Sequence, residues 1–170
     1  MIIDSLVRMF GRPFGIIRYH AYGRDVRKVV PPLVNLLASA QTSIKMATGE
    51  MYFGVYNDPK IVEIIESKIN RGVSVEIVHS PEIDPQTTKI PKLAKQGKLK
   101  MYRLYEEPKH HFWIIDGVHV LDEDPHAPRE KERKFYIIKN AGFLAETLSR
   151  EFEKRMIISI SKYKKSKKSK

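Results

Sequence analysis

The 170-residue sequence contains no cysteine, which excludes disulfides, thiolate catalysis and cysteine-based zinc sites. No apolar run approaches the roughly 20 residues that a membrane-spanning helix requires. The first residues include an acid, Asp4, and lack a small-residue cleavage site, so no signal peptide is expected. No internal repeat is present, and a chain of this length is expected to form one domain. These absences predict a cytoplasmic, single-domain protein for which no small-molecule cofactor is expected.

Acidic residues are scarce relative to basic ones, and the net charge is +11. The last nine residues contain no acid and carry six lysines: Lys162, Lys164, Lys165, Lys167, Lys168 and Lys170. A basic body with a strongly basic tail predicts a polyanionic partner, either nucleic acid or an anionic membrane surface. A disordered, solvated tail at residues 161–170 explains the same charge equally well.

The N-terminal segment, residues 1–15, has apolar residues at helical spacing. Ile3–Phe10 is therefore predicted to form a short amphipathic helix that docks on the core, on a partner or on a lipid surface. The helix signal ends at Gly11-Arg12-Pro13, where Gly and Pro interrupt it.

Strand and helix signals alternate through the main domain, residues 16–160. The expected strands are Ile16–Tyr22, Ser43–Thr48, Val73–His79, Leu99–Leu104, His111–Ile115, Val118–Leu121 and Lys134–Ile138. The expected helices are Asp25–Ala40, with Pro31 as an alternative start, Asp58–Asn70, Lys89–Gln96 and Asn140–Ile157. The strand–helix–strand rhythm predicts an α/β fold with a mixed, mainly parallel sheet flanked by helices.

The stretch 108–117 joins titratable side chains to a short apolar run and ends in an Asp-Gly turn. It holds the chain's one Trp and two of its six histidines, His110 and His111. Lys109 and His111 are two residues apart on the expected strand, so both side chains point to the same face. Such a pair would suit an anion, with His111 as a proton carrier near neutral pH. A hydrogen-bonded His111 beside a solvated Lys109 explains the pattern as well.

Three segments, taken in this order, resemble the phospholipase D-like superfamily. Residues 36–47, Leu-Leu-Ala-Ser-Ala-Gln-Thr-Ser-Ile-Lys-Met-Ala, are similar to the family's opening, in which a helix is followed by Ala-x-x-Ser-Ile and a strand. Residues 69–78 are similar to its Arg-Gly-Val-x-Val unit, and residues 114–117 to the end of its motif strand. The resemblance covers roughly residues 25–157 and implies a domain of one repeat.

Active members of this family bring together two copies of the signature His-x-Lys-x4-Asp, from one chain or across a dimer. One His attacks phosphorus, the other protonates the leaving oxygen, and the lysines hold the phosphate oxygens. A single repeat therefore implies a homodimer in which the two motif regions face each other.

Aligned on Asp116, the signature lacks its expected nucleophile and its phosphate-holding lysine. Lys109 stands at the His position and His111 at the Lys position. The family's Gly-Ser-x-Asn stretch aligns with Glu123-Asp124-Pro125-His126, whose acids would repel a phosphate. A shifted frame that makes His110 or His111 the nucleophile loses both the Lys and the Asp spacing. The resemblance therefore implies a degenerate member without phosphodiesterase activity, and its degenerate motif positions are Lys109, His111, Asp116 and His126.

Two further sets of residues contain side chains that metal or nucleic-acid sites use. His110, His119, His126 and Asp116 lack the spacing of a metal site, so no metal is expected. Aromatic residues near basic ones are typical of surfaces that stack on single-stranded nucleic acid. Those aromatics are Tyr102, Tyr105, Phe112 and Trp113, of which Phe112 and Trp113 fit an apolar core better.

The favoured function is a non-catalytic module that binds a polyanion, with nucleic acid as the first choice. Its anion-binding candidates are Lys109, His111, Lys162, Lys164, Lys165, Lys167 and Lys168. One alternative is a phosphodiesterase or nuclease that acts through His110 or His111 in a dimer, with Asp116 as the third catalytic candidate. The other is a protein-interaction or membrane-peripheral module that uses Ile3–Phe10 and the Lys tail.

Overall fold

The computed structural model describes residues 15–22, 26–108, 110–123 and 132–168. The expected helix at Ile3–Phe10 and the motif positions Lys109 and His126 lie outside these residues. The side chains of residues 162–168 also lie outside the description, although their backbone belongs to a helix. Within the described ranges, no helix has the length and apolar character needed to cross a membrane.

The described chain is built on one seven-stranded sheet with the order β1-β7-β6-β5-β2-β3-β4. The strands are β1 (Ile16–Tyr22), β2 (Ser43–Ala47), β3 (Ser74–His79), β4 (Lys100–Arg103), β5 (His111–Ile115), β6 (His119–Glu123) and β7 (Glu132–Ile138). The limits of β1 and β5 agree with the sequence prediction residue for residue. Each of the other strands begins and ends within about two residues of the predicted limits, which is the usual uncertainty of such boundaries.

The strand directions confirm a mixed sheet, but the expectation that it is mainly parallel is wrong. Among the described strands, only the β2–β3 and β3–β4 pairings are parallel, and the other four pairings are antiparallel. Five strands do share one direction, while β5 and β7 run the opposite way and are inserted between them. Each inserted strand creates two antiparallel pairings. Strands that share a direction are therefore not paired with each other where β5 or β7 lies between them.

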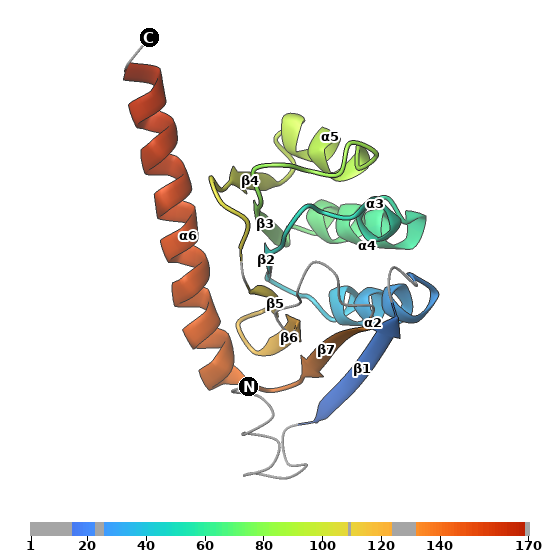
Figure 1. Cartoon of the computed structure of the whole chain (residues 1–170). Helices are drawn as coiled ribbons and strands as arrows, with labels where there is room; N and C mark the ends of the chain where they lie inside the picture. Colours follow the sequence, from blue (N-terminus) through green and yellow to red (C-terminus); the bar gives the residue numbers. More distant parts are fainter. Residues whose placement is uncertain (1–14, 23–25, 109, 124–131, 169–170) are drawn as a thin grey trace.

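Helices cover both faces of the sheet (Figure 1). The helices are α2 (Val26–Ala38), α3 (Phe53–Tyr56), α4 (Pro59–Asn70), α5 (Lys89–Lys95) and α6 (Gly142–Lys168). The first four lie on one face, and α6 crosses the other face on its own in the described chain. The sequence analysis missed α3, and α6 continues from its predicted end at Ile157 to Lys168.

The start of α2 differs from the alternative that the prolines suggested. The helix begins at Val26 and continues through Pro31 and Pro32, which remove two backbone donors from its second turn. Val30 and Leu33, on either side of the prolines, are buried in the core. Apolar burial of these two side chains offsets the missing hydrogen bonds.

An apolar layer lies on each face of the sheet. The larger layer joins the sheet to α2, α4 and α5, and includes the fully buried Leu37, Ile61 and Ile77. The smaller layer joins the sheet to α6 through Phe112 and Phe152. Because successive strand residues point to opposite faces, neighbouring residues of β5 contribute to different layers.

Asp116 joins the β5–β6 turn to the segment that enters β2. Its Oδ1 atom accepts hydrogen bonds from Thr42 N at 2.8 Å, Thr42 Oγ1 at 2.9 Å and Ser43 N at 2.9 Å, and its Oδ2 atom accepts one from Gln41 N at 2.8 Å. Partial burial alone would raise the pKa of Asp116, but these hydrogen bonds outweigh it and hold the pKa below its ordinary value of 3.8. The charged carboxylate therefore stabilises this end of the sheet.

Replacing Asp116 by Asn should destabilise the protein by about 1–2 kcal/mol near neutral pH, because the amide offers one acceptor oxygen where the carboxylate offers two. Asn tolerates the backbone φ of 54° found at this position, so the turn itself should persist. Since the folded pKa is depressed, the wild-type advantage is complete above the ordinary pKa of 3.8 and disappears as pH falls through the folded pKa.

Urea unfolding measured from about pH 7 to about pH 2 would test this prediction. Glu63→Gln, at an exposed position of α4, is the matched control and should leave the free energy of unfolding almost unchanged. A deficit in the Asp116→Asn variant that stayed constant down to the lowest pH would contradict the assigned role.

Candidate functional site

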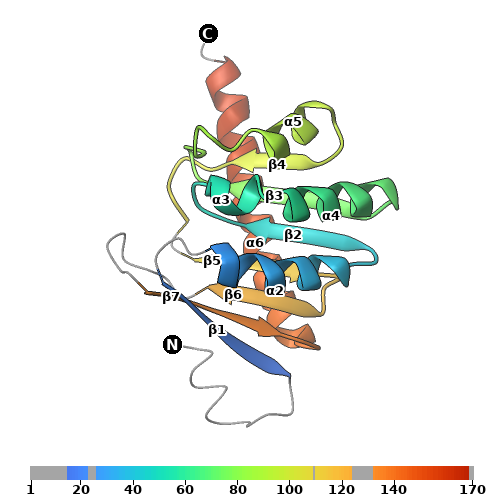
Figure 2. The ribbon, with the colours of Figure 1, turned by 90° about the vertical axis from the view of Figure 1, so that its right-hand side faces the viewer.

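Polar residues form a row along one edge of the sheet, at the ends of the strands. The carboxyl ends of β2, β3, β4 and β6 meet the amino end of β5 at this edge. Strand register pairs Arg103 with His79, and it pairs His111 with Glu123. Thr48 directly follows β2 and lies between these two pairs. These five residues are called the His111 row. Their alternate neighbours on the same strands belong to the larger core, so the row lies on the face covered by α2, α3 and α4 (Figure 2).

His111, a predicted anion-binding and catalytic candidate, lies close to two carboxylates. Its Nδ1 atom is 3.5 Å from Glu123 Oε2, and the two side chains are 16% and 20% exposed. On the other side of the ring, Nε2 and Glu107 Oε1 both lie within 3.4 Å of the point where a Cβ atom on Gly49 would stand. Negative charge therefore lies near the imidazole and repels a phosphate.

Gly49 allows this arrangement because it has no side chain. A Cβ atom there would lie 3.0 Å from both Cε1 and Nε2 of His111, closer than side chains normally approach. Glycine at position 49 thus has a steric reason, which is the close passage of the backbone beside the His111 ring. The carbonyl of Gly49 accepts a hydrogen bond from Ser80 N at 3.2 Å, which ties this turn to the end of β3.

Tyr56 of α3 covers the centre of the row. Its hydroxyl group is hydrogen-bonded to Thr48 and Trp113, and its ring centre is 6.1 Å from that of Trp113. Burial raises the pKa of Tyr56 strongly, the two hydrogen bonds lower it, and the Glu123 carboxylate raises it further. Tyr56 is therefore a neutral hydrogen-bonding group at all physiological pH values.

His79 is a member of the row that the sequence analysis did not single out. It is 5% exposed, and its Nδ1 atom lies 2.7 Å from the carbonyl oxygen of Ser80. Because a carbonyl can only accept, Nδ1 carries the proton. Burial lowers the pKa of His79, the bond to Ser80 opposes this change, and the nearby charge of Arg103 lowers it further. The one available signal was its place at the end of a strand in the parallel part of the sheet, where α/β proteins build their sites.

His110 points to the opposite face of the sheet, so the two adjacent histidines do not form one site. Its Nε2 atom is hydrogen-bonded to Asp122 Oδ1, and its backbone oxygen accepts a bond from Arg155 Nη1 at 2.9 Å. Arg155 also pairs with Glu151 at 2.9 Å and lies over the Phe112 ring. His110 therefore belongs to the contact between the sheet and α6.

The remaining candidates lie apart from the row. Asp116 and His119, whose Nδ1 atom accepts a bond from Asn140 N at 3.2 Å, are at the opposite edge of the sheet. Within the described ranges, no three His, Cys, Asp or Glu side chains gather as a metal site would need. The sequence prediction that Phe112 and Trp113 belong to the core is confirmed, since they are 0% and 4% exposed.

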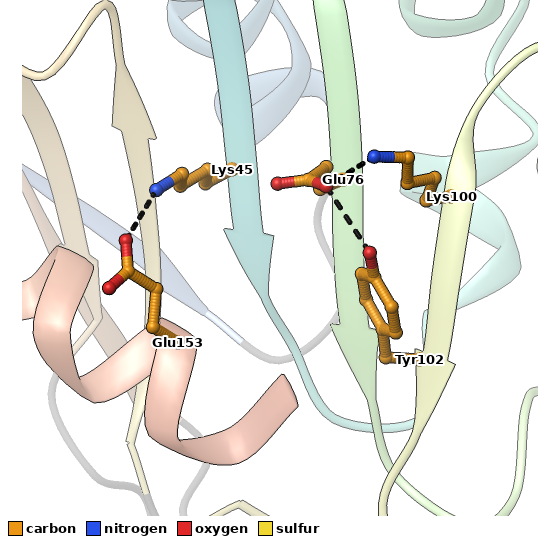
Figure 3. A network of polar contacts seen from close by, with 5 residues as sticks. All are labelled: Lys45, Glu76, Lys100, Tyr102 and Glu153. Atoms are coloured by element: carbon orange, nitrogen blue, oxygen red, sulfur yellow. Dashed lines mark hydrogen bonds and ion pairs between the residues drawn. The ribbon is translucent and has the colours of Figure 1, made fainter. Parts of the chain in front are cut away.

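Tyr102 lies on the face that α6 crosses, within a network of polar contacts (Figure 3). Its hydroxyl group donates to Glu76 Oε1 at 3.2 Å, and Lys100 Nζ contacts the same oxygen at 3.2 Å. Lys45 on β2, the strand next to that of Glu76, pairs with Glu153 of α6 at 3.3 Å. Tyr102 is thus bonded within the protein, and the side chain of Tyr105 is 49% exposed.

The geometry of the row decides what chemistry it suits. Glu123 can orient the His111 ring through its contact with Nδ1. Among the described members of the row, Arg103 is the cationic residue available to an anion, and it stands at the far end from Glu123. A phosphate placed beside His111 would meet Glu107 and Glu123, so this arrangement lacks the preorganised positive charge that phosphoryl transfer requires.

Replacing Gly49 by Ala should destabilise the protein by about 1–2 kcal/mol, because the new methyl group would displace the His111 ring from a nearly buried position. The same substitution in a His111→Ala background should cost much less. A double-mutant cycle measured by urea unfolding separates this coupling from any general effect of Ala at position 49. Gly142→Ala, where nothing lies within 4 Å of the added Cβ, is the control. Equal costs of Gly49→Ala with and without the His111 ring would contradict the close approach.

Comparison with known proteins shows similarity at the level of fold. No protein-family profile and no curated protein sequence matches the chain. Nuc, a phospholipase D family member from Salmonella typhimurium, is 20% identical with a TM-score of 0.60, over 82% of this chain and 93% of that one. NucT from Helicobacter pylori is 19% identical with a TM-score of 0.62, over 85% and 97%.

A third similar structure is TrmBL2, an archaeal chromatin protein with a novel mode of DNA binding. It is 16% identical with a TM-score of 0.62, over 90% of this chain and 57% of that one. The strand order and flanking helices described above have counterparts in Nuc and NucT, which are phospholipase D family members, and this confirms the fold expected from the sequence resemblance. The chain has the phospholipase D-like fold.

Proposed function

We propose that the chain is a non-catalytic phospholipase D-like module that binds a polyanion, with nucleic acid as the favoured ligand. The observation that carries the proposal is the basic end of α6. From Lys154 to Lys168 the helix contains seven Lys or Arg residues and no acid. A helix rises about 1.5 Å per residue, so these 15 residues carry roughly one positive charge per 3 Å of length, which is close to the spacing of about 3.4 Å between charges along one strand of a nucleic-acid duplex.

The basic end of α6 also has a defined position on the domain. Ser159 Oγ donates to the carbonyl oxygen of Arg103 at 2.6 Å, at the end of edge strand β4. Beyond this contact the helix extends past β4, away from the sheet (Figures 1 and 2). The backbone of this end of α6 therefore lies outside the body of the domain, where a nucleic acid can approach it.

The absence of catalysis in this proposal follows from the His111 row. The row places Glu123 and Glu107 beside the imidazole, and the motif alignment puts Lys109 where active members carry their nucleophile. TrmBL2, which shares the fold, is described as binding DNA, and this supports nucleic acid over other polyanions. In this proposal, the sheet with the His111 row is a retained scaffold, and the basic end of α6 is the binding surface.

Nucleic-acid affinity should depend steeply on salt, and part of that dependence should come from α6. Fluorescence anisotropy with labelled duplex DNA, single-stranded DNA and RNA, from about 50 to about 200 mM KCl, would measure the slope of log K against log salt. In the Lys162→Gln/Lys165→Gln/Lys168→Gln variant, the magnitude of this slope should fall by roughly 2–3, because each lost phosphate contact removes about 0.9 from it.

The matched control is Lys60→Gln/Lys92→Gln/Lys98→Gln, which removes the same charge from exposed positions on the opposite side of the sheet. It should change the slope by much less. If both variants lost affinity equally, net charge alone would explain binding and α6 would not be the site. Affinity that did not respond to salt would refute a polyanion ligand.

Hydrolysis of bis(p-nitrophenyl) phosphate in EDTA should not exceed the rate shown by the His111→Ala and His110→Ala variants, because the described neighbours of His111 include the carboxylates of Glu107 and Glu123, which do not stabilise the negative charge of the transition state. Measurable turnover that His111→Ala abolished would overturn the non-catalytic assignment and make the row a phosphodiesterase site. Turnover abolished by His110→Ala alone would place the nucleophile under α6.

A further inference from the structure

The first turn of α6 exposes a large aromatic side chain. Phe143 is 86% exposed, more than any other large hydrophobic residue of the described chain. Val118, in the turn that enters β6, is 39% exposed, and its carbonyl oxygen accepts a hydrogen bond from Ala141 N at 2.7 Å. Val118, Ala141 and Phe143 are here called the apolar corner. Binding of a polyanion does not require these side chains, and apolar surface exposed in this way is typical of a docking site.

The chain enters β1 beside the apolar corner. Ile16, the first residue of β1, pairs with Ile138 at the end of β7. A Cβ atom on Gly15 would lie 3.6 Å from Lys139 Cβ, so Gly15 is next to the segment that leads into α6. Figures 1 and 2 both show the start of β1 and the start of α6 at this end of the sheet. Residues 1–14, which precede Gly15, are therefore attached close to the corner.

The residues before Gly15 have an apolar stripe of their own. The apolar residues at helical spacing, from which an amphipathic helix at Ile3–Phe10 is predicted, are Ile2, Ile3, Leu6, Val7 and Phe10. Such a helix is about 12 Å long, and residues 11–14 can span about 13 Å when extended. The segment is therefore long enough to place its stripe against the apolar corner.

We propose that Ile3–Phe10 docks as a helix on the apolar corner of its own chain, with its apolar stripe against Phe143 and Val118. Of the three destinations that the sequence leaves open for this segment, the proposal selects the domain itself over a partner or a lipid surface. The docked helix covers the first turn of α6, at the end opposite to the basic residues. It therefore leaves the proposed polyanion-binding surface free.

The size of the corner favours a tethered segment over a separate molecule. Two exposed side chains offer a few hundred Å² at most, well below the roughly 1,000 Å² that stable association between separate chains needs. A segment joined to β1 loses little translational freedom when it docks, because the chain already holds it at a high effective concentration. A small contact is therefore sufficient for the segment, but not for a second copy or another protein.

The charges of the segment argue against a lipid surface. Helices that lie on anionic membranes are typically rich in Lys and Arg on their polar side. Ile3–Phe10 contains one acid, Asp4, and one base, Arg8, so it has no net attraction to anionic lipid. The side chains of the apolar corner are uncharged, so apolar contact alone accounts for docking there.

Trypsin cleavage of the folded full chain, without nucleic acid, tests the docking. Arg8 and Arg12 are the trypsin sites in residues 1–14, and Pro13 blocks cleavage after Arg12. Cleavage after Arg8 therefore reports on the segment, and mass spectrometry of the intact chain follows the loss of residues 1–8. A docked helix must open before trypsin can cut it, so the rate constant follows the population of the open state.

Substitutions on either side of the contact should expose the segment. Phe143→Ser and Leu6→Ser should each raise the rate constant of cleavage after Arg8 about tenfold or more, because each removes apolar area from the contact. The double variant should be cleaved within about twofold of either single variant, because one substitution already breaks the contact. This lack of additivity separates docking from any direct effect of Leu6→Ser on trypsin.

Ile157→Ser is the matched control on the same helix. Ile157 is 60% exposed, and it follows Phe143 by 14 residues, or about 21 Å along α6. Its substitution should leave the rate constant within about twofold of wild type. Circular dichroism should show unchanged secondary structure in Phe143→Ser and Ile157→Ser, since both side chains are exposed.

A wild-type chain that trypsin cuts after Arg8 as fast as the Phe143→Ser variant would overturn the proposal, as would equal rates in Phe143→Ser and Ile157→Ser. Protection that grows with protein concentration, from about 1 µM to about 100 µM, would assign the contact to a second copy instead. Protection that needs added phosphatidylserine vesicles would assign the segment to lipid. None of these outcomes depends on nucleic-acid binding, so the proposal can fail independently of the proposed function.

Discussion

The direction of β5 is the constraint on which the site depends. β5 runs opposite to β2 and β6, so its first residue lies beside their last residues. This single reversal brings His111 next to Thr48 and Glu123, and the parallel pairings of β3 and β4 extend the row to Arg103. At the other end of β5, the turn places the Asp116 carboxylate against the backbone that enters β2. One strand therefore positions the candidate site at its start and the main polar anchor of the sheet at its end.

Carboxylates have opposite consequences at these two edges. Asp116 is satisfied by four hydrogen bonds to protein donors, so its charge stabilises the fold without needing a ligand. Glu123 and Glu107 instead stand beside a titratable ring, where a phosphate-binding site would carry cations. Local sequence does not distinguish these roles, because each depends on which backbone or ring the fold brings to the carboxylate.

Much of the fold could be predicted from sequence because its signals are local. The limits of β1 follow from a β-branched and aromatic run between glycines, and Asp58 caps α4 by accepting a bond from Lys60 N at 2.9 Å. Pairing direction could not be predicted, since it depends on which strands are inserted between others. His79 could not be identified as a site residue, because its position in the His111 row depends on the register of β3 with the neighbouring strands β2 and β4. The length of α6 was missed because a Lys/Ser composition suggests disorder, although Lys is a good helix former once a packed helix precedes it.

The anchoring of α6 explains how a retained scaffold can support a different function. Two backbone carbonyls at the amino end of β5 and the end of β4, those of His110 and Arg103, accept bonds from Arg155 and Ser159 of this helix. These contacts use no side chain of the His111 row, so the row's chemistry can change without loosening α6. After Ser159 the sequence of the helix is mostly lysine and serine. The proposed binding surface on α6 would therefore need the sheet only to hold the helix in position, and the carboxylates beside His111 lie on the opposite face of the sheet.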